Sequence, residues 1–307
     1  MREVTVLMPV YNAMPYLSKA VDSILQQSLR DFVFLAIDDG STDGSQEYLD
    51  RVSDPRIKIV HQPHRGLGAA LNQGLAICET EFLARMDADD VALPSRLEAQ
   101  LAFLRGHKDI GMLGTQIAYL SISGRRGFSP PIPSTHETIV ADLLRGHFAL
   151  CHATMMCRTL QLKGIGGYRV NGIGEDWDLF LRMGEASKLA NLEEILQLVR
   201  VHSGSVCGQS LPRIRGQIAF ACHCAKRRAE GQPEITFDQF LAERRARPFW
   251  QRAADQMDWY ALSQYRRALS DILSAHPGSG YARLAWAALC SPRWTAQRIA
   301  RTMRRIT

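Results

Sequence analysis

The chain has 307 residues, of which 46% are hydrophobic and 22% are charged. This composition is enough to bury the core of one large domain or of two modest ones. It excludes a collagen-like, low-complexity or largely disordered protein. The net charge of +6 is unevenly spread: residues 211–307 hold 17 Lys and Arg against 7 Asp and Glu, whereas residues 1–210 hold 20 against 24.

The cysteines and the N-terminal sequence indicate where in the cell the protein is expected. The seven cysteines are odd in number and scattered, which argues against a disulfide framework. Cys222-His223-Cys224 has no second Cys pair at zinc-finger spacing. The sequence begins directly with a strand-like segment, and no run reaches the ~18 apolar residues of a spanning helix. We therefore expect a cytoplasmic protein, either soluble or peripheral at the inner face of the cell membrane.

Strand-like and helix-like segments alternate over the first 90 residues. Short apolar, β-branched runs predict strands, and apolar residues at helical spacing predict helices. The predicted strands are 4–8, 32–37, 57–60 and 81–86, and the predicted helices are 15–28, 43–51 and 66–76. This order favours an α/β fold with a Rossmann-like, mostly parallel sheet and helices on both faces.

The strand signal ends near residue 206. Before it, the pattern predicts helices at 94–104 and 175–186, strands at 111–120, 147–157 and 196–201, and a loop or hairpin at 124–133. After it, the pattern predicts helices at 213–229, 235–247, 249–274 and 279–305. We therefore expect a catalytic domain over residues 1–206 and a basic helical region over residues 207–307.

The most informative segment is an acidic cluster that follows the fourth predicted strand. Asp87, Asp89 and Asp90 come directly after an apolar run, and Asp87 and Asp89 project to the same side of extended backbone. Converging carboxylates are costly unless a cation neutralises them, and hard oxygen ligands suit Mg²⁺ or Mn²⁺. The alternative is a solvated loop that caps the helix beginning at Pro94.

Other nucleotide and metal motifs are absent or incomplete. No G-x-x-x-x-G-K-[ST] loop occurs, and Gly66-Leu67-Gly68 lacks a third glycine at dinucleotide spacing. The segment from Asp39 to Asp50 partly resembles a calcium loop, but a strand-like run precedes it where such a loop needs a helix. A metal beyond the fourth strand, where open α/β sheets bind their ligands, implies a diphosphate substrate.

Six segments in order resemble the family 2 glycosyltransferases, which have the A-type, Rossmann-like nucleotide-sugar fold. The resemblance spans residues 4 to about 206 and leaves the C-terminal third uncovered. The matching segments are Val6–Asn12, Val21–Ser28, Ile37–Asp43, Arg65–Asn72, Asp87–Asp90 and Gly174–Asp178.

The resemblance implies a donor site for a UDP-sugar. Pro9, Tyr11 and Asp39 would hold the base, and Arg65 would lie near the base or the phosphates. Asp89 would bind the metal, and Asp87 would approach the ribose or the metal's water shell. His202 matches a position that binds metal or diphosphate. The alternatives are packing for Tyr11, a turn cap for the adjacent Asp38, and a backbone-bonded loop histidine for His202.

The resemblance also implies a catalytic base. Gly174-Glu175-Asp176-Trp177-Asp178 looks like the family's base motif before a helix, which makes Asp176 the candidate. In an inverting transfer it would take a proton from the acceptor hydroxyl. The alternative is that Glu175 and Asp176 are simply acidic first-turn residues. His152 and Arg158 would belong to acceptor-side structure.

The predicted function is inverting transfer of a hexose or N-acetylhexosamine from a UDP-sugar to a glycan or lipid-linked acceptor, in cell-envelope polysaccharide or lipopolysaccharide synthesis. The alternatives are a non-catalytic sugar-nucleotide binding module and a nucleotidyltransferase of related fold. Arginines and tryptophans interleave after residue 226, as in helices that lie on anionic membranes. A solvated helix surface is the simpler interpretation, and no nucleic-acid partner is expected.

Overall fold

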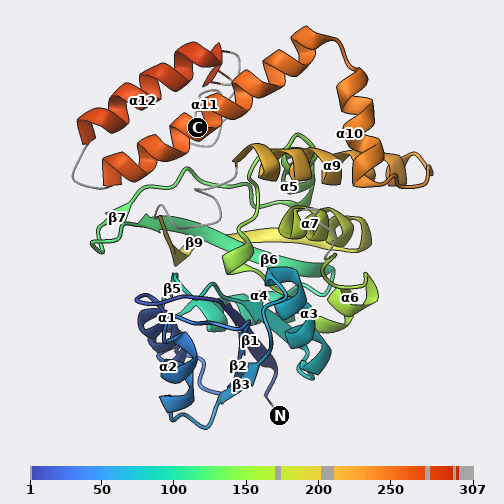
Figure 1. Cartoon of the computed structure of the whole chain (residues 1–307). Helices are drawn as coiled ribbons and strands as arrows, with labels where there is room; N and C mark the ends of the chain where they lie inside the picture. Colours follow the sequence, from blue (N-terminus) through green and yellow to red (C-terminus); the bar gives the residue numbers. More distant parts are fainter. Residues whose placement is uncertain (1, 170–173, 202–210, 274–276, 293–294, 297–307) are drawn as a thin grey trace. The chain divides into compact units, whose positions relative to one another are not determined.

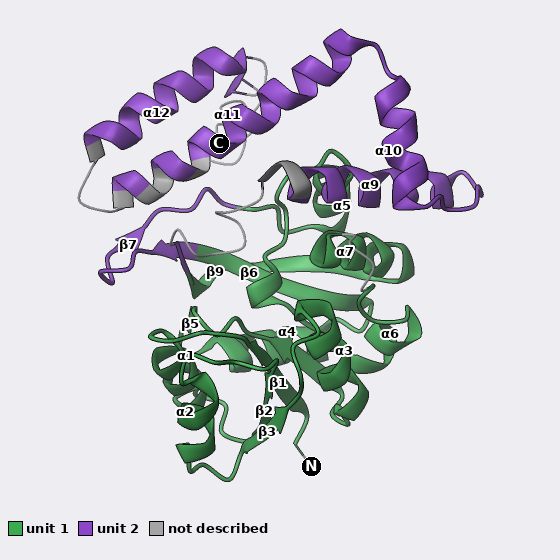
Figure 2. Cartoon of the chain, in the orientation of Figure 1, with its two compact units in different colours: residues 1–117, 132–199 green, residues 118–131, 200–307 purple. Residues whose placement is uncertain are grey.

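The computed structural model of the chain describes residues 2–169, 174–201, 211–273, 277–292 and 295–296 (Figure 1). The chain divides into two compact units (Figure 2): unit 1 comprises residues 1–117 and 132–199, and unit 2 comprises residues 118–131 and 200–307. The predicted boundary between residues 206 and 207 falls outside the described residues, so it stays a prediction.

The described strands form one nine-stranded sheet in the order β3-β2-β1-β4-β8-β6-β9-β5, with β7 paired to β6. The strands are β1 (Val4–Val10), β2 (Phe32–Asp38), β3 (Ile57–His61), β4 (Phe82–Arg85), β5 (Val91–Ala92), β6 (Ile110–Leu120), β7 (Arg126–Gly127), β8 (Met156–Arg158) and β9 (Lys188–Arg200). Strands β1 to β4 are parallel, whereas β8 is antiparallel to β4 and β6. The predicted α/β fold is confirmed, and the strands after residue 90 make the whole sheet mixed.

Helices cover both faces of the parallel part of the sheet. The helical elements of unit 1 are α1 (Leu17–Leu25), α2 (Ser45–Arg51), α3 (Leu67–Ile77), α4 (Arg96–Gly106), α5 (His136–Leu144), the 3₁₀ turn η1 (His152–Thr154), α6 (Thr159–Gly164) and α7 (Glu175–Ala186). Every residue of β1 is buried, and successive side chains point to opposite faces. Val6 and Met8 join a buried cluster with residues of α1 and α4. Leu7 faces α3, where a Cβ on Gly74 would lie 2.2 Å from Leu7 Cδ1, so any other residue at position 74 would force Leu7 to move.

The structure corrects the prediction between residues 136 and 200. Residues 147–157 are not one strand, because a 3₁₀ turn interrupts them and β8 begins only at Met156. Strand β9 begins at Lys188 rather than near residue 196, and its exposed centre at Glu193, Glu194 and Ile195 breaks the apolar pattern. Helices α5 and α6 were not predicted.

Helices make up most of the described part of unit 2: α9 (Leu211–Ala229), α10 (Phe237–Ala246), α11 (Phe249–Leu273) and α12 (Pro277–Cys290). Helix α10 begins with a capping box, in which the Thr236 side chain accepts from the Gln239 backbone and the Gln239 side chain accepts from the Thr236 backbone. Phe220 packs against Phe237 and Phe240, with centroid distances of 5.2 and 5.3 Å. In the described residues, no helix combines the length and apolar character that crossing a membrane requires.

A charged turn fixes the start of β3. Arg56 donates from Nε and from Nη2 to the two carboxylate oxygens of Asp54, both at 2.9 Å, and also donates to the Leu25 carbonyl. The guanidinium lies 4.8 Å from the centroid of the Phe32 ring. Hydrogen bonds from Arg56 lower the pKa of Asp54 to about 2. The carboxylate form therefore stabilises the folded state above the ordinary pKa of an aspartate.

We expect Asp54→Asn to lower the free energy of unfolding at pH 7 by on the order of 2 kcal/mol, because a pKa lowered on folding adds stability. The contribution should fade as the pH falls from about 4 towards about 2. Urea unfolding at several pH values measures it. Asp31→Asn is the control, since its carboxylate is 71% exposed in a surface pair with Arg2; a loss that does not shrink in acid would contradict the expectation.

Candidate functional site

Asp39 lies just after β2 and organises the loop between β3 and α3. Its Oδ1 accepts from Gln62 Nε2 at 2.6 Å and from the Arg65 backbone at 2.9 Å. Its Oδ2 accepts from the Gly66 backbone at 2.8 Å, and His64 Nδ1 lies 2.9 Å away. Burial alone would raise the pKa of Asp39, but these hydrogen bonds hold it below its usual value. A nucleotide base that donates to Asp39 would have to displace Gln62 or His64.

Tyr11 presents an aromatic ring at the end of β1. It is 49% exposed and stacks on His64 with centroids 4.0 Å apart and planes at 22°. Tyr11 is therefore not a core residue, and its packing partner is another exposed loop ring. Arg65 is exposed in the same loop, whereas Pro9 is buried in β1 beside Ile37 of β2.

The loops after β1 and β2 are tied together by their own polar groups. Asn12, with a φ of 49°, accepts from the Thr42 backbone at 2.8 Å. Asp43 accepts from the Met14 backbone at 2.8 Å and from the Ser45 backbone at 3.0 Å. The calcium-like segment is thus a hydrogen-bonded connection between loops. Asp38 accepts from the Ser41 backbone at 3.2 Å, which is the turn-capping alternative.

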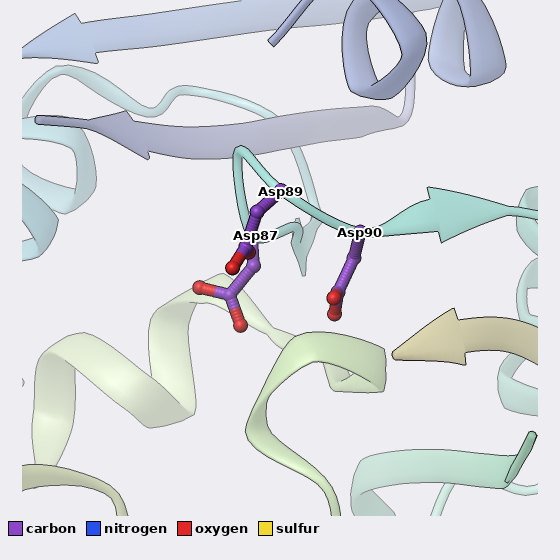
Figure 3. A group of neighbouring side chains, drawn as sticks. All are labelled: Asp87, Asp89 and Asp90. Carbon is purple, nitrogen blue, oxygen red and sulfur yellow. The ribbon is translucent and has the colours of Figure 1, made fainter. Parts of the chain in front are cut away.

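The acidic cluster forms as predicted at the carboxyl end of β4. One carboxylate oxygen from each of Asp87, Asp89 and Asp90 lies within 4.8 Å of the others, and Figure 3 shows the three side chains on one side of the loop. Asp90 is buried, while Asp87 and Asp89 are half-buried. In the described part of the chain, this is the one group of three or more such side chains that could hold a metal ion.

A buried arginine that was not predicted faces this cluster. Arg85, at the end of β4, contacts both carboxylate oxygens of Asp87 through its two terminal nitrogens. The Arg85 side chain is 3% exposed and that of Asp87 is 36% exposed. Burial raises the pKa of Asp87 against the effect of Arg85, and Asp89 and Asp176 raise it further. The signal in the sequence was a basic residue in an apolar strand, two positions before the first aspartate.

A second buried arginine is linked to the cluster by hydrogen bonds. Arg96 is fully buried in α4 and donates to the Arg85 carbonyl at 2.6 Å and to Gln197 Oε1 at 2.9 Å. Gln197 in turn lies 3.5 Å from Asp90 Oδ2. Burial lowers the pKa of Arg96 to about 10, so the guanidinium stays charged at neutral pH. The loop with the three aspartates is therefore tied to α4 and β9.

The candidate base lies in the first turn of α7. Asp176 is half-buried, accepts from the Trp177 backbone at 2.8 Å, and is close enough to Asp87 and Tyr168 to raise their pKa values. Burial raises the pKa of Glu175, and Asp176 raises it further. The structure thus brings Asp176 and the acidic cluster into one electrostatic environment.

The neighbours of Asp176 hold the helix in place. Trp177 is buried and donates from its indole to the Leu143 carbonyl at 3.0 Å. Asp178 is buried against Arg182, with a closest N···O distance of 2.7 Å. Arg182 also donates to the carbonyls of Ile165 and Gly167, which ties α7 to the segment after α6.

Three predicted residues remain: His152, Arg158 and His202. His152 lies 2.9 Å from the Tyr168 hydroxyl, and burial together with Arg85 keeps its pKa far below the usual value. Arg158 donates to the carbonyls of Ile110 and Leu104, which gives it a role in the fold. His202 lies outside the described residues.

Solved structures share this fold. The chain superposes on "S. aureus TarS 1-349 in complex with UDP-GlcNAc" with a TM-score of 0.62 and 17% identity, covering 93% of this chain and 89% of that one. The fold is that of the A-type glycosyltransferases.

Sequence comparison gives the family. The model for glycosyl transferase family 2 matches residues 5–161, and the chain belongs to this family. It is 34% identical over 210 residues to the putative glycosyltransferase EpsE of Bacillus subtilis (strain 168), across 66% of this chain and 74% of EpsE. It is 30% identical over 210 residues to the O-antigen biosynthesis glycosyltransferase WbnJ of Escherichia coli, across 66% of this chain and 81% of WbnJ.

Proposed function

We propose that the protein transfers a hexose or N-acetylhexosamine from a UDP-sugar to a hydroxyl of a glycan or lipid-linked acceptor, with inversion, in polysaccharide synthesis. The observation that carries the proposal is the acidic cluster Asp87, Asp89 and Asp90 beyond β4, within electrostatic reach of Asp176 on α7. The name of WbnJ supports a role in O-antigen or related glycan synthesis, and the ligand named for TarS supports a UDP-sugar.

The cluster fits a divalent cation, Mn²⁺ or Mg²⁺. Its ligands are carboxylate oxygens, which hard cations prefer. Because Arg85 already contacts both oxygens of Asp87, Asp89 is the residue we assign to the cation. When bound, the cation would stabilise the negative charge that develops on the departing diphosphate.

The chain's own residues would do the rest. Tyr11 would stack on the base, and Asp39 would accept from it after Gln62 or His64 moves aside. Asp176 would accept the proton of the acceptor hydroxyl as that oxygen attacks the sugar from the side opposite the diphosphate. Buried Trp177, and Asp178 with its Arg182 partner, would fix the position of Asp176 during the attack.

A panel of nucleotide-sugars tests the donor. We expect UDP-sugars with Mn²⁺ to raise the melting temperature of the full chain, and chelation to abolish the shift. UDP release with a glycan acceptor should follow. A melting-temperature shift with UDP-sugars but no turnover with any acceptor would favour the non-catalytic binding module. Formation or consumption of pyrophosphate by the protein would favour the nucleotidyltransferase. Absence of any nucleotide-dependent shift would contradict the proposal.

The predicted membrane association is best supported by one part of unit 2, at the junction of α10 and α11. We call it the basic–aromatic corner, and it consists of Arg245, Arg247, Phe249, Trp250 and Arg252. All five are exposed, with Phe249 at 70% and Trp250 at 61%. No acidic residue occurs between Arg244 and Asp255. Trp259 does not belong to this corner, because Arg244 covers it at 4.7 Å. We propose that the corner binds the anionic inner face of the cell membrane.

Flotation with vesicles tests this proposal. We expect the full chain to bind vesicles with anionic lipid and not neutral ones, and Arg245→Gln with Arg247→Gln to weaken partitioning by roughly tenfold or more, at about 1 kcal/mol per charge. Tyr281→Ser on α12 is the control, because Tyr281 is as exposed as Trp250, at 62%, but is distant in sequence from Arg245 and Arg247. Equal flotation of the wild type and the double variant would contradict the proposal.

A further inference from the structure

We propose that Arg85 is a positioning residue that keeps Asp87 out of the cation's coordination shell and makes cation binding depend on the nucleotide diphosphate. This inference rests on the proposed function. The Arg85 side chain is almost fully buried, so its contacts decide which carboxylate takes which role.

Arg85 is fixed on every side that the structure describes. Its backbone N–H donates to the Met155 carbonyl at 2.8 Å, and its own carbonyl accepts from Arg96. Its two terminal nitrogens contact the two oxygens of Asp87, while Nε is buried and has no hydrogen-bond partner among the described residues. The Asp87 carboxylate is therefore the contacting counter-ion of a buried cation, and Asp90 acts on Arg85 with a smaller electrostatic effect.

This pairing constrains Asp87. A bidentate arginine–carboxylate pair fixes both oxygens in one plane. If Asp87 turned to a metal, Arg85 would be left as an unpaired buried charge, which is strongly unfavourable. Asp87 can therefore still accept a hydrogen bond on its exposed side, from a ribose hydroxyl or a metal-bound water, while it stays paired with Arg85.

The pairing also sets the charge that a free cation meets. Three carboxylates, those of Asp87, Asp89 and Asp90, stand beside two buried guanidinium groups, those of Arg85 and Arg96. The five groups sum to a formal charge of −1, and Asp176 nearby adds a further negative charge. The two guanidinium groups thus cancel most of the attraction that the three carboxylates would exert on a divalent cation, and we expect the cation alone to bind weakly. A nucleoside diphosphate adds negative charge and oxygen ligands at the same place. Cation and nucleotide should therefore bind together, each raising the affinity for the other.

Titration of Mn²⁺, followed by the electron paramagnetic resonance signal of the free ion, tests the inference without turnover. We expect the wild-type full chain to bind Mn²⁺ weakly alone, and at least about tenfold more tightly with UDP. In Arg85→Met, Mn²⁺ alone should bind about tenfold more tightly, because one opposing charge is gone and Asp87 is released as a ligand. Adding UDP should then change the affinity little.

Further variants sharpen the test. Asp87→Asn should weaken Mn²⁺ binding of the wild type by no more than the loss of one charge accounts for, about tenfold, and should reverse the gain in Arg85→Met. Arg85→Lys keeps the charge and should keep the dependence on UDP. Arg85→Gln, which removes the charge but keeps a polar side chain, replaces Arg85→Met if that variant does not fold, and the same gain is expected. Arg105→Met removes an equal charge from an exposed pair with Glu3 and should change nothing.

The outcomes separate the two proposals. If the wild type binds Mn²⁺ with UDP, but Arg85→Met binds Mn²⁺ alone no more tightly than the wild type does, the inference about Arg85 is wrong and the proposed function stands. Complete loss of Mn²⁺ binding in Asp87→Asn, with UDP present, would also overturn it, because Asp87 would then be a direct ligand. If the wild type binds no Mn²⁺ with any nucleotide, the metal-dependent function falls, and this inference falls with it.

Discussion

Asp176→Asn is expected to lower kcat by about 10³-fold, within the 10² to 10⁴ range typical of general-base catalysis, with little change in the KM for the donor. The amide preserves the shape of the side chain and its contact with the Trp177 backbone, but it cannot accept the acceptor's proton. Steady-state assays of UDP release at saturating donor measure the effect, and the melting temperature should change little because Asp176 is only half-buried.

Two variants on the same helix control this experiment. Glu175→Gln tests the adjacent carboxylate, whose pKa is raised by burial and by Asp176, and it should reduce kcat far less. Glu185→Gln, exposed at the far end of α7, should behave as the wild type. If Glu175→Gln is the inactive variant and Asp176→Asn is not, the base has been assigned to the wrong carboxylate.

Asp89→Asn is expected to abolish Mn²⁺-dependent activity, by at least about 10³-fold, because it removes the charged ligand of the cation that would stabilise the departing diphosphate. Calorimetric titration of Mn²⁺ in the presence of UDP should show loss of binding, and the thermal shift with UDP-sugar should disappear. Both readouts are independent of the acceptor, which the sequence does not identify.

The control for Asp89 is Asp31→Asn, a surface carboxylate in the same unit with 71% of its side chain exposed. It should bind Mn²⁺ and turn over as the wild type does. Normal turnover by Asp89→Asn would remove the carboxylate–cation interaction from the mechanism. The acidic cluster would then be a structural feature that Arg85 and Arg96 neutralise.

The predicted strands and helices agree best with the structure where a local apolar pattern marks them. Strands β1 to β4 and the helices between them lie within a few residues of the prediction, because buried strands and one-sided helices leave a repeating apolar signal. The pattern was weaker after residue 136. There β9 exposes its centre, so only its second half was predicted. Strand β8 has only three residues, and the prediction placed it at the end of a longer strand.

The site follows the same division. Asp87, Asp89 and Asp90 could be located because the strand that delivers them and their spacing are contiguous in the sequence. Arg96, Gln197 and Asp90 could not be joined in advance, since Arg96 and Gln197 are 101 positions apart and meet only when α4 packs against β9. Asp39 was predicted as a contact for the base, and the structure adds that it already holds the loop at residues 62–66.

The sequence by itself determined the α/β class, the order of the parallel strands along the chain and the residues at their carboxyl ends, because apolar periodicity and the direction of the chain fix these locally. Only the tertiary structure decided which charges meet. A buried arginine pairs with whichever carboxylate the fold brings within reach, and the pair persists because an unpaired buried charge is strongly unfavourable. The pairing of Arg85 with Asp87, and the assignment of the cation to Asp89 that we derive from it, therefore depend on the folded chain.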